Sequence, residues 1–63
     1  MNSNQFVREL KAAGIEVHNK RGTGHKLLIN PRNGRTSEIP MHGGGKQLGT
    51  GLMRKIRKDL GLD

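Results

Sequence analysis

Histidine is the side chain of this sequence best suited to acid–base chemistry, because its ordinary pKa lies near physiological pH. The 63-residue chain has three, His18, His25 and His42, and no cysteine. The lack of cysteine excludes a disulfide framework, a thiolate zinc site and a cysteine nucleophile. The histidines also lack the paired short spacing of metal ligands, with no carboxylate beside them in a ligand pattern. We therefore expect neither a metal nor another cofactor.

Other common catalytic motifs are absent. No serine stands in a context that resembles a nucleophile elbow. Gly22-Thr23-Gly24 is too short for a P-loop and lacks the Gly-Lys-Ser/Thr that follows in one. Gly43-Gly44-Gly45-Lys46 also fails, because no strand-to-helix junction surrounds it. A serine triad and a P-loop nucleotide site are both disfavoured.

His25 has the most suggestive surroundings. It follows the glycine-rich turn of residues 22–24 at the mouth of a predicted strand, among Lys20, Arg21 and Lys26. A neutral imidazole there could take the proton from a ribose 2′-hydroxyl while the cations stabilise the charged phosphorane. This would be metal-free RNA cleavage, in which a positioned histidine typically contributes ~10²–10⁴-fold.

Residue types alone favour a structural role for His25. If the strand alternates, His25 packs beside Leu27 and Ile29 on one side of it. Geometry rather than composition identifies a catalytic base, so both interpretations stay open at this point. His18 is predicted to point outward, and we assign it no role.

The net charge indicates a polyanionic partner. Twelve Lys and Arg against five Asp and Glu give +7, which favours nucleic acid over a merely soluble basic protein or one that meets an acidic protein. No apolar run exceeds residues 27–29, which excludes a transmembrane span. Residues 1–5 lack the features of a signal peptide. We expect one cytoplasmic domain over residues 1–63.

Apolar residues at helical spacing predict a first helix over residues 3–13. Asn2 or Ser3 is suited to cap it, and Gln5 completes a weak capping box with Asn2. Gly14 is placed to end the helix in a left-handed conformation. The predicted buried face consists of Phe6, Val7, Leu10 and Ala13.

Three strands follow in the pattern. Alternation predicts the first over residues 15–21 and the second over 25–29. Residues 30–34, with Asn-Gly at the end, predict a tight hairpin turn. A third strand fits residues 35–41 and ends near Pro40, which cannot donate to a ladder.

The chain closes with a loop and a second helix. Residues 42–51 are glycine-rich and without periodicity, which is typical of a loop. Thr50 is predicted to cap a helix over residues 51–60, with Gly61 at its end and Leu62 folding back. The order predicts an α+β fold, α-β-β-β-α, with a three-stranded antiparallel sheet and both helices on one face. The buried face of the last helix is predicted to hold Leu52, Met53, Ile56 and Leu60.

Several short motifs, in order along nearly the whole chain, resemble those of one family. Gly22-Thr23-Gly24-His25 is preceded by Lys20-Arg21 and followed by Leu27-Leu28. Further matches are Gly34-Arg35, Pro40-Met41-His42 and residues 52–62. Each motif is weak, but together on a small basic chain they resemble the HicA toxin family and its Gly-Ser/Thr-X-His turn and strand.

The resemblance implies a fold, an activity and a partner. It implies a double-stranded-RNA-binding-domain-like fold, and cleavage of mRNA through one histidine, which maps onto His25. Gly22, Thr23 and Gly24 would shape the turn that positions it. A HicB-type antitoxin would neutralise the enzyme. His42 lies where the family often has a histidine and would be a complementary acid, although a solvated loop histidine is the favoured interpretation.

The sequence departs from the family in its second strand, where members often carry an aromatic residue. This chain has Leu27, Leu28 and Ile29 instead, so contacts to RNA should depend on phosphates rather than on base stacking. The basic face of the last helix would meet either RNA or the antitoxin. The candidate phosphate contacts are Lys20, Arg21, Lys26, Arg32, Arg35 and Lys46.

Two other functions fit the same residues. One is a non-catalytic RNA-binding module of the same fold, since double-stranded RNA is recognised mostly by shape and phosphate contacts. The other is a small basic structural protein associated with the ribosome. Fold alone does not decide among them.

Overall fold

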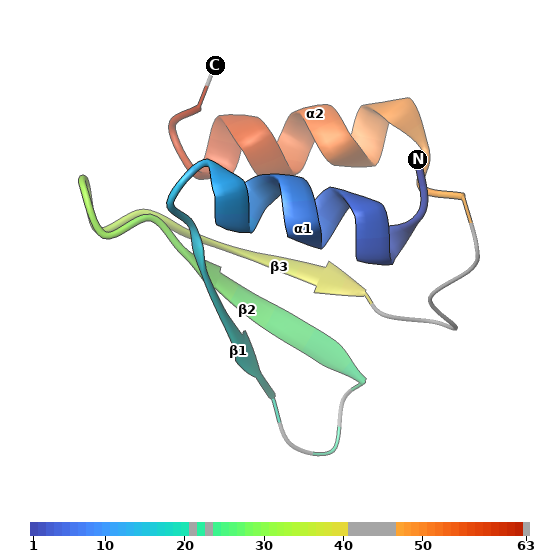
Figure 1. Cartoon of the computed structure of the whole chain (residues 1–63), viewed down its shortest axis with the longest axis horizontal. Helices are drawn as coiled ribbons and strands as arrows, with labels where there is room; N and C mark the ends of the chain where they lie inside the picture. Colours follow the sequence, from blue (N-terminus) through green and yellow to red (C-terminus); the bar gives the residue numbers. More distant parts are fainter. Residues whose placement is uncertain (21, 23, 41–46, 63) are drawn as a thin grey trace.

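A computed structural model describes residues 1–20, 22, 24–40 and 47–62. Both helices lie on the same face of an antiparallel sheet, and no described element covers the other face (Figure 1). The predicted α-β-β-β-α order is confirmed, and it is compatible with a double-stranded-RNA-binding-domain-like fold. The elements are α1 (Ser3–Ala12), β1 (Glu16–Asn19), β2 (His25–Ile29), β3 (Thr36–Pro40) and α2 (Thr50–Asp59).

The two helices begin differently. At α1 the predicted capping box is present: Asn2 Oδ1 accepts from the Gln5 amide at 2.9 Å, and Gln5 Oε1 accepts from the Asn2 amide at 3.0 Å. The prediction that Thr50 caps the second helix is wrong. Thr50 is already helical, and the cap position one residue earlier is Gly49, which has no side chain to bond the first turn.

Both helices end as predicted. Gly14 and Gly61 take left-handed conformations, with φ of 91° and 73°. After Gly61 the chain turns back, and the Leu62 amide donates to the Arg57 carbonyl at 2.9 Å. Leu62 packs against the core, which satisfies the hydrophobic contact typical of such helix ends.

The sheet has the order β1-β2-β3, and its register decides which side chains the helices cover. Val17 pairs with Leu28, and Lys26 pairs with Ile39. Leu28 and Ile39 are fully buried beneath the helices. Because side chains alternate along a strand, His25, Leu27 and Ile29 point to the uncovered face. β1 is shorter than predicted, since it begins at Glu16 and ends at Asn19.

The core lies between the helices and the sheet, and it contains the predicted apolar residues of both helices except Ala13. Ala13 is exposed, because α1 ends at Ala12 and Ala13 is its C-cap. Leu48 packs against it, and its amide donates to the Met1 carbonyl at 2.9 Å, which joins the segment before α2 to the chain start. The rest of the predicted loop, residues 42–46, lies outside the described residues. Neither described helix is long and apolar enough to cross a bilayer. The buried apolar residues are Phe6, Val7, Leu10, Ile15, Leu28, Ile39, Ile56 and Leu60.

Candidate active site

His25 lies at the first position of β2, and the alternation that buries Leu28 beneath the helices places it on the opposite face of the sheet. It pairs with Pro40, the last residue of β3, and its carbonyl accepts from the Lys20 amide at 3.2 Å. The side chain is 36% exposed. The imidazole therefore lies partly exposed at the end of the sheet where β2 begins.

The imidazole has a carboxylate partner from the neighbouring strand. His25 Nδ1 lies 3.0 Å from Glu38 Oε1, and Lys20 Nζ lies 3.2 Å from Glu38 Oε2. The hydrogen bond from His25 and the one from Lys20 lower the pKa of Glu38 below its ordinary value of 4.5. Glu38 is therefore ionised at neutral pH, and its two carboxylate oxygens contact two different side chains, those of His25 and Lys20.

Glu38 was not among the residues that the sequence pattern singled out. It is 13 positions from His25, and no motif contains both. The register of the β2–β3 hairpin brings them together, because Glu38 pairs with Leu27 and so lies diagonally across from His25 on the same face. The sequence offered one signal for this contact: counting the residue pairs of the hairpin outward from the predicted turn would have placed Glu38 near His25.

The structural interpretation of His25 is only partly supported. His25, Leu27 and Ile29 share one side of β2, as alternation predicts. That side is uncovered, whereas Leu28 on the other side is fully buried. His25 therefore contributes no side chain to the core, and its environment is polar at the nitrogen that contacts Glu38.

The predicted phosphate contacts near His25 divide between the two faces of the sheet. Lys20 is at the uncovered face, bound to Glu38. Lys26 points to the helical side, where it lines a shallow polar hollow with Arg8 and Lys11 of α1. Three basic side chains thus surround one hollow at the same end of β2.

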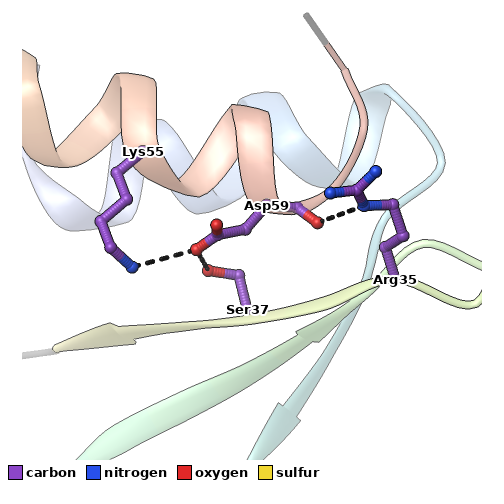
Figure 2. A network of polar contacts seen from close by, with 4 residues as sticks. All are labelled: Arg35, Ser37, Lys55 and Asp59. Atoms are coloured by element: carbon purple, nitrogen blue, oxygen red, sulfur yellow. Dashed lines mark hydrogen bonds and ion pairs between the residues drawn. The ribbon is translucent and has the colours of Figure 1, made fainter.

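Arg32 and Arg35 lie in and after the β2–β3 turn, at the opposite end of β2. His25 and Ile29 are the two ends of that strand. At ~3.3 Å per residue, the turn that follows Ile29 therefore begins roughly 13 Å from His25. Arg35 has a structural contact there, because its Nε donates to the Asp59 carbonyl at 2.9 Å (Figure 2).

Asp59 gathers the other groups of this network from α2 and β3. Its carboxylate accepts from Ser37 Oγ at 3.2 Å and from Lys55 Nζ at 3.1 Å (Figure 2). Lys55, one turn earlier in α2, is the main cause of the lowered pKa of Asp59. The network joins the end of α2 to the start of β3.

Four predicted residues, Arg21, Thr23, His42 and Lys46, lie outside the described residues. Gly24 has φ of 68°, so the turn before His25 uses the left-handed region as its glycines predict. His18 is exposed, as predicted, and its Nε2 lies 3.1 Å from Glu16 Oε1. In the described part of the chain, no three His, Cys, Asp or Glu residues gather in a group able to hold a metal ion.

Comparison with known proteins shows the family to which the chain belongs. The family model for the HicA toxin of bacterial toxin–antitoxin systems matches residues 3–62. A protein of Pseudomonas fluorescens (strain Pf0-1), named "Probable mRNA interferase HicA", is 39% identical over 62 residues, which cover 98% of this chain and 97% of the relative. No solved structure matches. The match over nearly the whole length shows that the chain belongs to the HicA toxin family.

Proposed function

We propose that this chain is a metal-independent endoribonuclease that cleaves mRNA in the cytoplasm and thereby stops translation, with His25 as its general acid–base residue. The observation that carries the proposal is the position of His25. A half-exposed imidazole lies at the end of a strand beside Lys20, in a chain that is 39% identical to a protein named as an mRNA interferase.

The proposed reaction is an internal transesterification of RNA. The neutral imidazole takes the proton of a ribose 2′-hydroxyl, and that oxygen attacks the adjacent phosphorus. The bond from phosphorus to the 5′-oxygen breaks, and the leaving oxygen accepts a proton from water. The products are a 2′,3′-cyclic phosphate end and a 5′-hydroxyl end. Basic groups beside the phosphate stabilise the negative charge that develops in the transition state.

Binding of RNA is proposed to depend on phosphate contacts. The +7 charge attracts the polyanion, and β2 has no aromatic side chain on which a base could stack. Lys26, with Arg8 and Lys11 around the same hollow, is placed to hold a phosphate near the end of β2 that carries His25. Phosphate contacts carry no base information, so we expect relaxed sequence preference.

The antitoxin partner is proposed to be a HicB-type protein that covers the face carrying His25. That face combines cationic groups with the half-buried Leu27 and Ile29, which have no described element over them. An acidic rim with a small apolar centre would complement it. Binding of the partner should therefore block RNA cleavage, and a complex that cleaves at the full rate would contradict this placement.

The test is cleavage of end-labelled RNA in EDTA by the wild-type chain and by His25→Ala. We expect the wild type to cut and to leave 2′,3′-cyclic phosphate ends. His25→Ala should keep its melting temperature and RNA affinity but lose ~10²–10⁴ in rate, about 3–5 kcal/mol of transition-state stabilisation.

His18→Ala is the matched control, because it removes an exposed imidazole from the adjacent strand on the same face. It should cut at the wild-type rate. A folded His25→Ala protein that also cuts at the wild-type rate would rule out the catalytic role. Binding without cleavage by the wild type would favour the non-catalytic RNA-binding module.

A further inference from the structure

Glu38 connects three segments of the uncovered sheet face. It projects from β3, its Oε1 lies 3.0 Å from Nδ1 of His25 on β2, and its Oε2 lies 3.2 Å from Nζ of Lys20, just after β1. Each carboxylate oxygen thus has its own partner. A carboxylate held at both oxygens has a defined orientation, whereas a single exposed ion pair leaves the side chain free to rotate.

The chemistry of the two groups determines where the imidazole proton lies. An ionised carboxylate has only acceptor sites, so a hydrogen bond to it requires a proton on Nδ1 of His25. The lowered pKa of Glu38 keeps that carboxylate ionised at neutral pH. In the neutral imidazole, Nε2 is then the basic nitrogen, and the ring plane is directed by the bond on its other side.

We propose that Glu38 is the positioning residue of His25, and that Lys20 in turn holds Glu38 in place. Glu38 selects the tautomer with the proton on Nδ1, which assigns proton transfer with RNA to Nε2. It also stabilises the imidazolium that forms when Nε2 takes the 2′-hydroxyl proton. The inference rests on the proposed ribonuclease function, and it adds a residue that does not touch the substrate.

A second histidine–carboxylate pair on the same face provides the internal comparison. His18 Nε2 lies 3.1 Å from Glu16 Oε1, but both residues belong to β1 and are two positions apart. The Glu16 carboxylate has no described cation bound to it, unlike that of Glu38. A histidine–carboxylate contact alone therefore does not identify the site, whereas the Lys20–Glu38–His25 chain does.

The experiment compares Glu38→Gln with Glu16→Gln, using the complete chain. Nitrogen-15 NMR of the imidazole rings reports the tautomer of His25 without any need for activity. Cleavage of saturating labelled RNA and RNA affinity are measured on the same samples. Glu38→Asp is included, because it keeps the charge on a shorter side chain.

In the wild type we expect the proton of neutral His25 on Nδ1. Glu38→Gln should lose this preference and cut saturating RNA about 10- to 100-fold more slowly, with unchanged RNA affinity and melting behaviour. Glu38→Asp should recover part of the rate, and Glu16→Gln should match the wild type throughout.

Two results separate the possible failures. If the wild type cuts RNA and Glu38→Gln cuts equally fast with the proton still on Nδ1, the positioning role is overturned while the proposed function stands. If the wild type does not cut RNA, the proposed function fails. In that case a wild-type His25 without preference for the Nδ1 tautomer overturns the positioning role as well, and a clear preference that Glu38→Gln abolishes supports it.

Discussion

The two ends of the sheet both carry polar networks, but the networks are built on different partners. At the β2–β3 turn, side chains donate to backbone carbonyls at the end of α2. Asn30 Nδ2 and Asn33 Nδ2 reach the Leu60 carbonyl at 2.8 and 3.2 Å, and Arg35 reaches that of Asp59. The last carbonyls of a helix have no partners within it. Side chains of the turn therefore supply the missing donors.

At the opposite end, the contacts join one side chain to another. Lys20, Glu38 and His25 each expose roughly two fifths of their side chains, and exposed ion pairs contribute little to stability. Asn30 at the turn is buried instead, 5% exposed. The difference teaches that a basic or polar residue must be judged by its partner. The contacts of the turn network join the sheet to the end of α2, whereas the His25 network is exposed to solvent and joins only side chains.

Replacing one glycine at each end of the sheet by alanine, Gly61 or Gly24, should give the largest difference in stability between the two ends. An added Cβ at Gly61 would meet Asn33 Nδ2 at 2.6 Å, whereas at Gly24 it would meet no atom of the described residues within 4 Å. Gly61→Ala should cost about 2–3 kcal/mol, from left-handed strain and a displaced hydrogen bond, and Gly24→Ala about 1–2 kcal/mol from strain alone. Urea denaturation measures both.

The cleavage rates of the same variants should rank in the opposite order. Gly24→Ala alters the turn that precedes His25 and should slow cleavage per folded molecule, whereas Gly61→Ala should not. Equal stability losses in the two variants, or slower cleavage in Gly61→Ala alone, would contradict the assignment of stability to the turn end of the sheet and of cleavage to the His25 end.

Salt dependence of RNA binding should separate Lys26 from Arg35. In a His25→Ala background, which keeps the RNA intact, Lys26→Ala should reduce the logarithmic salt slope by about 0.7, the value for one phosphate contact on a single strand. Arg35→Ala should leave the slope unchanged, because that side chain binds the end of α2. Fluorescence anisotropy at several salt concentrations measures the slope. A reduced slope in Arg35→Ala with an unchanged slope in Lys26→Ala would show that RNA contacts the β2–β3 turn instead.

Acid should weaken both networks. We expect this effect on stability to be smaller than the effects of the glycine substitutions and of Lys26→Ala. The pKa values of Glu38 and Asp59 are lowered from 4.5 and 3.8 by their donors. The unfolded chain then binds more protons, so the stability is present above these ordinary values and lost as pH falls through the folded values. From about pH 5 to 3, where carboxylates rather than histidines gain protons, melting temperatures should fall less steeply in Glu38→Gln and Asp59→Asn. The flattening should begin at higher pH for Glu38→Gln. Curves parallel to the wild type would show that the carboxylates have no such coupling.

Most of the fold was predictable because its signals are local. The Asn2–Gln5 capping box joins residues three positions apart, and the glycines that end both helices act on the adjacent turn. Apolar spacing identified the buried faces of α1 and α2 for the same reason, except at Ala13, which lies past the end of α1 and is exposed. The error at Thr50 is also local, since a cap position is uncertain by one or two residues when several small residues precede a helix.

The sequence by itself determined the order of the elements and the basic character of the chain, and it singled out His25 as the candidate catalytic histidine. Tertiary structure decided which partners each polar group has. It brought Glu38 to His25, joined Arg35 to the end of α2 and placed Lys26 beside Arg8. These contacts depend on strand register and on which face of the sheet the helices cover. The register of the β2–β3 hairpin follows from its turn, so only a count outward from that turn could have paired Glu38 with His25. The face that the helices cover is set by packing between segments far apart in the chain, and no spacing within a motif could reveal it.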